Sequence, residues 1–161
     1  MKVLVSDKLA KEGIKILETQ EGVTVDCKFG LQPEELKSII KEYDALIVRS
    51  GTTVTADIIE AADKLKFIGR AGVGLDNVDL KAATQKGIVA MNTPAGNTTA
   101  TAEHTMSMIL ALSRNVPQAY ASMKAGKWDR SKFSGIELHG KKLGIIGFGR
   151  IGSTVARFAK S

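Results

Sequence analysis

The stretch KKLGIIGFGRIG at residues 141–152 decides how the whole chain is interpreted. Residues 143–146 form an apolar run with the length of a buried strand, and Gly147 follows where a tight turn would begin. Three apolar residues then recur at helical spacing, Ile151, Val155 and Phe158. The pattern predicts a strand, a glycine turn and a helix in succession.

The three glycines of this stretch fit the G-x-G-x-x-G motif of dinucleotide-binding folds. Gly147 permits the turn, Gly149 lets the backbone approach a pyrophosphate, and Gly152 lets the helix pack closely on the strand. The new helix would present free N–H groups to the phosphates. A glycine-rich turn that binds nothing is the alternative interpretation.

Dinucleotide-binding units normally carry an acidic residue about 20 residues beyond this motif, where it binds the ribose hydroxyls. The sequence ends at Ser161, so that acid and the later strands of such a domain are not in it. We therefore expect a truncated piece of a longer enzyme, in which residues 141–161 begin a Rossmann domain that binds a dinucleotide.

Residues 1–96 predict a self-contained domain. Segments with helical periodicity alternate with five apolar stretches of strand character, at residues 3–5, 23–25, 45–48, 67–69 and 88–91. Such alternation implies right-handed crossovers, and the expected fold class is α/β, a flavodoxin-like doubly wound parallel sheet. In this interpretation Asp7 caps the first helix and Cys27 is a core residue.

The turn-forming residues 92–97 mark the end of this domain. Beyond them a helix is predicted from Thr98 to Arg114, and apolar residues surround its axis, so it should be buried on several sides. That suggests an interface between domains or subunits, with an ordinary core helix as the alternative. We expect residues 97–140 to form interdomain or dimerisation helices and a loop.

The composition is that of an ordinary globular protein. A single cysteine excludes a disulfide framework and fits a reducing compartment. The N-terminus leads directly into a predicted strand without signal-peptide features, and no apolar run reaches membrane-spanning length. We expect a cytoplasmic protein with no membrane partner.

The net charge of +6 does not indicate a nucleic-acid partner, because the basic residues are scattered and few aromatic residues lie among them. One local concentration of basic residues is present: Lys124, Lys127, Arg130, Lys132, Lys141 and Lys142. It is either a solvated loop or a surface that binds a small phosphorylated molecule.

Two loops of the first domain carry groups suited to anions. RSGT at residues 49–52 follows the third predicted strand, and RAGVG at residues 70–74 follows the fourth. Each offers a guanidinium, which binds carboxylates and phosphates bidentately, at the sheet edge where ligands of open parallel sheets bind. The alternative is that the two arginines pair with local acids such as Asp57 or Asp76.

No catalytic constellation is visible. His104 and His139 have no carboxylate at a persuasive spacing, so each is interpreted as structural or solvent-exposed. No cluster of cysteines and histidines suggests a metal site.

Six ordered matches make the chain resemble the family of D-2-hydroxyacid dehydrogenases. They are IVRS at 47–50, GRAGVGLDNVD at 69–79, MNTP at 91–94 with Asn97, AEHT at 102–105, GKW at 126–128, and the glycine motif with Arg150. So many matches in order are more specific than any one motif.

The resemblance implies oxidation of 3-phosphoglycerate to 3-phosphohydroxypyruvate with NAD, a step of serine biosynthesis. It implies substrate-binding roles for Arg49, Ser50, Thr52, Arg70, Gly72, Val73, Gly74, Asn97 and Arg130. Arg130 would reach across a dimer to the substrate phosphate. Cofactor contacts are implied for Val73, Gly147, Gly149, Arg150, Ile151 and Gly152.

By the same resemblance the catalytic histidine, its glutamate partner and the arginine that polarises the carbonyl lie beyond Ser161. The expected function is that of a fragment of an NAD-dependent oxidoreductase without turnover of its own. The alternative is a non-catalytic module that binds a small anion or dimerises. We expect a small phosphorylated 2-hydroxy acid as ligand and a homodimer or higher oligomer formed through residues 98–140.

Overall fold

The computed structural model of the chain describes residues 1–160, and Ser161, the last residue of the predicted segment 141–161, lies outside the described residues. The chain divides into two compact units, Met1–Gly96 and Asn97–Ser161. Each unit has its own secondary structure and is described by itself.

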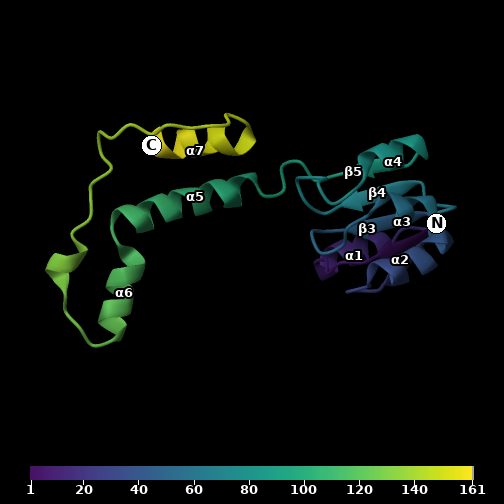
Figure 1. Cartoon of the computed structure of the whole chain (residues 1–161), viewed down its shortest axis with the longest axis horizontal. Coiled ribbons are helices and arrows are strands. Elements are labelled where there is room, and N and C mark those ends of the chain that lie inside the picture. Colours follow the sequence, from purple (N-terminus) through teal and green to yellow (C-terminus); the bar gives the residue numbers. More distant parts are fainter. Residues whose placement is uncertain (161) are drawn as a thin grey trace. The chain divides into compact units, whose positions relative to one another are not determined.

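The first unit is built on a five-stranded parallel sheet with the strand order β2-β1-β3-β4-β5 (Figure 1). Its strands are β1 (Lys2–Val5), β2 (Thr24–Cys27), β3 (Ala45–Val48), β4 (Phe67–Arg70) and β5 (Val89–Met91). This is the strand order of the flavodoxin-like doubly wound fold. The predicted fold class is confirmed.

Helices connect the strands as crossovers. They are α1 (Lys11–Glu18), α2 (Pro33–Ile39) with the short 3-10 turn η1 (Ile40–Glu42), α3 (Ala56–Glu60) and α4 (Leu80–Gln85). The direction of winding reverses after β2, and because crossovers are right-handed, α1 lies on the opposite face of the sheet from the other helices. Proline at the first position of α2 suits a helix start, where its missing N–H would have no partner in the helix.

The main core lies between the sheet and helices α2, α3 and α4. Leu46 of β3 and Ile68 of β4 have no exposed surface and pack in one cluster with Leu36, Ile58 and Ile59. The other face of the sheet is covered less completely. The register places Phe67, Val89 and Met91 on this face of β4 and β5, and they are 37%, 49% and 49% exposed.

Two predictions for the first unit are wrong. Asp7 does not cap the first helix, because α1 begins at Lys11 with Ala10 at its N-cap, and the Asp7 carboxylate binds a different loop. Cys27 is exposed and not part of the core, because it ends the edge strand β2 with no neighbouring strand on its far side.

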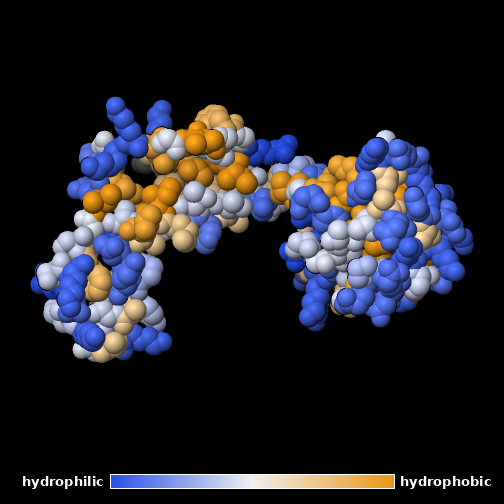
Figure 2. Space-filling model, in the orientation of Figure 1, coloured by the Kyte–Doolittle hydropathy of each residue, from blue (hydrophilic) through white to orange (hydrophobic). Residues whose placement is uncertain are grey.

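The second unit contains α5 (Thr98–Ser113), α6 (Val116–Lys124), the 3-10 turn η2 (Arg130–Phe133) and α7 (Arg150–Lys160). α5 packs against α7, and the buried apolar side chains are Ala102 on α5 and Val155 on α7. α5 is not buried on several sides within this chain, since Leu110 and Leu112 are 50% and 79% exposed. Figure 2 shows apolar side chains gathered over these two helices.

Residues 143–146 do not form the predicted strand. A strand is held by hydrogen bonds to a neighbouring strand, and the described part of the second unit offers none. Ile146 is consequently exposed over its whole side chain. The turn at Gly147 and the helix after it are formed as predicted.

Truncation of the central core side chain Leu46 to alanine should lower the free energy of unfolding by about 2–5 kcal/mol, because it leaves a cavity among fully buried neighbours. Ile16→Ala, at a position 63% exposed on α1, is the matched control and should change the stability little. Urea unfolding followed by circular dichroism measures both, and equal midpoints for the two variants would contradict this account of the core.

Candidate functional site

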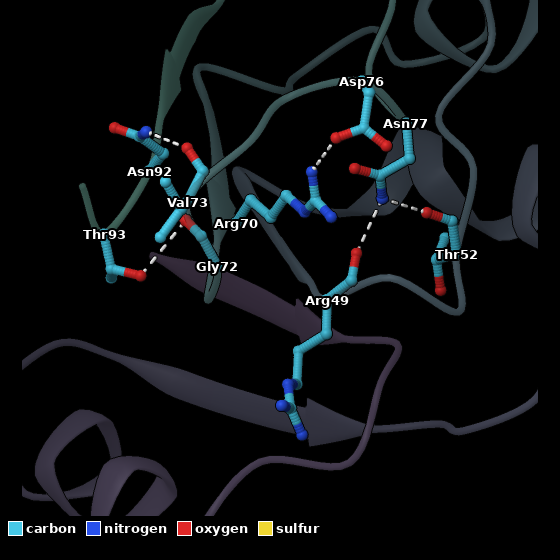
Figure 3. A network of polar contacts seen from close by, with 9 residues as sticks. All are labelled: Arg49, Thr52, Arg70, Gly72, Val73, Asp76, Asn77, Asn92 and Thr93. Atoms are coloured by element: carbon cyan, nitrogen blue, oxygen red, sulfur yellow. Dashed lines mark hydrogen bonds and ion pairs between the residues drawn. The ribbon is translucent and has the colours of Figure 1, made fainter. Parts of the chain in front are cut away.

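The candidate site of the first unit lies at the carboxyl edge of the sheet, in the loops that follow β1, β3, β4 and β5. Strand order reverses between β1 and β3, and ligands of open α/β sheets bind at such a switch point. The RSGT loop leaves β3 at this point, and the loop from Arg70 to Gly74 leaves the adjacent strand β4. The two predicted anion loops are therefore neighbours (Figure 3).

The loop at residues 49–52 presents its polar side chains to solvent. Arg49 is exposed, and its Nη1 has only a long hydrogen bond, 3.4 Å, to the carbonyl of Lys8. Ser50 is also exposed. The hydroxyl of Thr52 lies 2.9 Å from the hydroxyl of Ser6, the one fully buried polar residue among those described.

The loop at residues 70–74 is held by its neighbours through carbonyl groups. Thr93 donates to the carbonyl of Gly72 from its backbone N–H at 2.9 Å and from its hydroxyl at 3.1 Å. The Asn92 side chain donates to the carbonyl of Val73 at 2.5 Å. With these carbonyls engaged, the N–H groups of Val73 and Gly74 donate to nothing in the described chain, and they remain available to an anion.

Arg70 is largely buried, with 11% of its side chain exposed, and its Nη1 pairs with Asp76 Oδ1 at 2.5 Å. Its Nε is buried and has no hydrogen-bond partner in the described part of the chain. The guanidinium fits because Gly72 and Gly74 lack side chains: an added Cβ would lie 3.3 Å from Nε and 3.0 Å from Nη1, respectively.

Arg49 and Arg70 therefore differ in whether an acidic side chain pairs with them. Arg70 has the acidic partner that the alternative interpretation foresaw, whereas Asp57 pairs with Lys37 at 3.3 Å and not with Arg49. The hydrogen bond from Arg70 is the largest cause that holds the pKa of Asp76 below its ordinary value. Because Asp76 is 82% exposed, its carboxylate is screened by water.

Sequence reasoning missed two residues of this edge, Asp7 and Asn77. The Asp7 carboxylate accepts hydrogen bonds from the backbone N–H groups of Arg49 and Thr52 at 2.6 and 3.0 Å. Asn77 donates to the carbonyls of the same two residues (Figure 3). The available signal for Asp7 was its place directly after a buried strand, where a polar residue reaches the carboxyl edge.

The glycine loop of the second unit depends on the missing side chains of Gly147 and Gly152. Gly147 has a φ of 91°, a value that L side chains rarely adopt. A Cβ at Gly152 would overlap the carbonyl of Gly147, so the first turn of α7 can pack there only without a side chain. A Cβ at Gly149 would meet nothing within 4 Å, which leaves its backbone open to a ligand. Arg150 and Ile151 begin α7 directly behind this opening.

The remaining predicted positions lie in the second unit. Asn97 is the N-cap of α5, is exposed, and makes no side-chain capping bond. Arg130 is exposed at the start of η2, beside Asp129, which pairs with Lys132 at 3.2 Å. Trp128 in the preceding turn is 72% exposed.

The histidines have no catalytic partner here. Neither His104 nor His139 is bonded or ion-paired to a carboxylate among residues 1–160, and both are exposed. The described residues contain no group of three or more acidic, histidine or cysteine side chains able to hold a metal ion. In the same part of the chain, no helix has both the length and the apolar character needed to cross a membrane.

The family model for the catalytic domain of D-isomer specific 2-hydroxyacid dehydrogenases matches residues 3–156. A D-3-phosphoglycerate dehydrogenase of Methanocaldococcus jannaschii is 55% identical over 161 residues, which are 100% of this chain and 30% of the relative. The human D-3-phosphoglycerate dehydrogenase is 57% identical over 155 residues, or 96% of this chain and 29% of the relative. The chain thus spans less than a third of the length of these curated relatives.

Solved structures agree in fold. The TT0316 protein of Thermus thermophilus superposes with a TM-score of 0.90 at 34% identity, over 99% of this chain and 53% of that protein. An NAD+-bound 3-phosphoglycerate dehydrogenase of Entamoeba histolytica gives a TM-score of 0.78 at 35% identity, over 99% of this chain and 50% of that one.

Replacement of Arg70 by glutamine should return the pKa of Asp76 towards its ordinary value, because the main cause of its lowering is removed. A carboxyl with a lowered pKa in the folded state stabilises the fold above its unfolded pKa, and that contribution is lost as the pH falls through the folded value. NMR titration of the Asp76 carboxyl measures the change. An identical titration in the variant and the wild type would contradict the pairing.

The variant Gly152→Ala should loosen α7, because the new Cβ overlaps the Gly147 carbonyl. Amide hydrogen exchange of residues 150–160 should be faster than in the wild type. Gly144→Ala is the matched control, since its Cβ meets nothing within 4 Å. Equal exchange rates in the two variants would show that the close approach at Gly152 is not needed.

Proposed function

Because this chain belongs to the family of D-isomer specific 2-hydroxyacid dehydrogenases, we propose that it forms the substrate-binding part, and the beginning of the cofactor-binding part, of an NAD-dependent dehydrogenase. The proposed reaction is the oxidation of 3-phosphoglycerate to 3-phosphohydroxypyruvate, which leads into serine biosynthesis. The observation that carries the proposal is the convergence of two arginine loops at the switch point of the sheet. Family membership favours this over a non-catalytic anion-binding or dimerisation module.

The substrate carries a phosphate and a carboxylate, and the first unit offers donors for both. Arg49, Ser50 and Thr52 from one loop and Arg70 from the next supply guanidinium and hydroxyl groups, which suit a phosphate. The backbone around Gly72, Val73 and Gly74 suits the carboxylate, since the N–H groups of Val73 and Gly74 donate to nothing in the described chain. Asn97 and Arg130 are proposed as further contacts, with Arg130 reaching the phosphate of a partner subunit.

The glycine loop of the second unit fits a dinucleotide. The open backbone at Gly149, the positive φ of Gly147 and the close packing at Gly152 are what a pyrophosphate at a helix N-terminus needs. Arg150 and Ile151 would border the pyrophosphate, and Val73 would lie towards the nicotinamide. NAD, when bound, accepts the hydride from the carbon that carries the substrate hydroxyl.

We propose that residues 1–161 have no turnover by themselves. Hydroxyl oxidation requires a base to take the hydroxyl proton, and a histidine in that role needs a carboxylate to orient it. His104 and His139 have no such partner among the described residues. The base is proposed to come from residues outside this stretch, as the resemblance implies.

A homodimer or higher homo-oligomer is proposed to form through residues 98–140. The protein is proposed to act in the cytoplasm. Several large apolar side chains of this segment are at least half exposed: Met108, Leu110, Leu112, Val116, Tyr120, Met123, Trp128 and Ile136. Aromatic and methionine side chains are enriched in subunit interfaces, and exposed apolar patches of this kind mark contact surfaces.

The purified chain should bind 3-phosphoglycerate in isothermal titration calorimetry and should produce no NADH from 3-phosphoglycerate and NAD. Arg49→Ala should weaken binding about 10- to 100-fold, the range expected for loss of a hydrogen bond to a charged group. Lys15→Ala, which removes the same charge from the exposed face of α1, is the control. Equal affinities in the two variants would refute the proposed role of the arginine loop, and NADH production would refute the absence of turnover.

A further inference from the structure

The backbone of residues 49–52 is held in place almost entirely by hydrogen bonds to side chains from other loops. In the described part of the chain, none of these four residues makes a backbone–backbone hydrogen bond. The N–H and carbonyl groups of Arg49 and Thr52, at the two ends of the loop, instead bond to Asp7 and Asn77. The shape of the loop therefore depends on two side chains that sequence analysis did not associate with the site.

Asp7 binds the donors of the loop. One carboxylate oxygen, Oδ2, accepts from the N–H of Arg49 at 2.6 Å and from the N–H of Thr52 at 3.0 Å. Asp7 follows β1, which pairs with β3 next to it, so the bond spans the switch point. Gly51 permits the close approach, since a Cβ there would lie 2.6 Å from Asp7 Oδ1.

Asn77 binds the acceptors of the same loop. Its Nδ2 donates to the carbonyls of Arg49 and Thr52, at 2.6 Å each. These two bonds fix the amide orientation, because a flipped amide would place its oxygen against two carbonyl oxygens. Asn77 Oδ1 is buried and has no partner in the described chain.

We propose that Asp7 and Asn77 are positioning residues, which hold the loop of Arg49 and Ser50 in the conformation that binds the substrate anion. The inference rests on the proposed function, because it assigns a role in the same site. Neither residue needs to touch the substrate. With the backbone fixed in the free chain, the loop loses little conformational entropy when the anion binds, and affinity rises accordingly.

The negative charge of Asp7 argues for positioning over direct binding. A carboxylate beside an anion site repels the ligand, so Asp7 does not serve as a substrate contact. Its value lies in accepting two N–H groups with one oxygen. The amide oxygen of an asparagine can accept the same two hydrogen bonds without the negative charge. An Asp7→Asn variant therefore distinguishes a positioning role from a role that depends on the charge.

The test measures 3-phosphoglycerate affinity by calorimetry, and amide hydrogen exchange of Arg49 and Thr52 by NMR, on the 161-residue chain. The variants are Asp7→Ala, Asp7→Asn and Asn77→Ala. Asp63→Ala is the matched control, because it removes an exposed carboxylate that lies before β4, at the opposite edge of the sheet. Urea unfolding of each variant shows whether the fold is retained.

Asp7→Ala and Asn77→Ala should each weaken binding by about tenfold or more, the affinity equivalent of fixing the backbone of one residue. Both should speed exchange at the loop amides. Asp7→Asn should restore most of the affinity and protection, and Asp63→Ala should change neither.

Wild-type affinity in Asp7→Ala would overturn the proposal. So would an Asp7→Asn variant that binds as weakly as Asp7→Ala while its loop amides stay protected, since the charge itself would then matter. If the wild-type chain bound no 3-phosphoglycerate, the proposed function would fail. The positioning inference would then be decided separately by amide exchange, and unchanged exchange in Asp7→Ala would refute it.

Discussion

The parallel pairing of β1 with β3 is the constraint on which the rest of the first unit depends. It places the two chain segments that leave these strands side by side at one edge, although 41 residues separate Lys8 from Arg49. Winding reverses at this point, so no crossover helix covers the gap between the two strands, and polar groups from both loops can converge there. The apolar core beneath the edge keeps the strands fixed, and the loops at the edge carry the polar groups proposed to bind the ligand.

The edge contains two carboxylates beside groups proposed to bind an anion, and each has a different physical role. Asp76 pairs with Arg70 from an exposed position, which keeps the guanidinium charge compensated while the site is free. Asp7 bonds only to backbone N–H groups, so its charge is balanced by peptide dipoles and not by a side chain. A site proposed to bind an anion can thus include acids where they hold the geometry of the donors.

The second unit shows how far local sequence can build structure without its neighbours. The positive φ of Gly147 and the close approach of Gly152 to the Gly147 carbonyl are local, whereas α7 also packs against α5. The strand character of residues 143–146 is not realised, since a strand requires a partner. The same reasoning applies to α5, whose apolar side chains surround its axis but are half or more exposed where no element covers them.

The sequence by itself determined the element order, the doubly wound fold and the membership of the chain in its family, because apolar periodicity and ordered motifs are local or linear properties. It also located both arginine loops, since residues that follow buried strands must reach the carboxyl edge. It did not reveal that Asp7 serves Arg49 and Thr52, that Asn77 joins the same loop, or that Arg70 and not Arg49 has an acidic partner. Only the tertiary structure decided these, because hydrogen bonds between residues far apart in sequence depend on strand order and register. The place of Asp7 after a buried strand indicated the carboxyl edge, but not which groups its carboxylate would bond there.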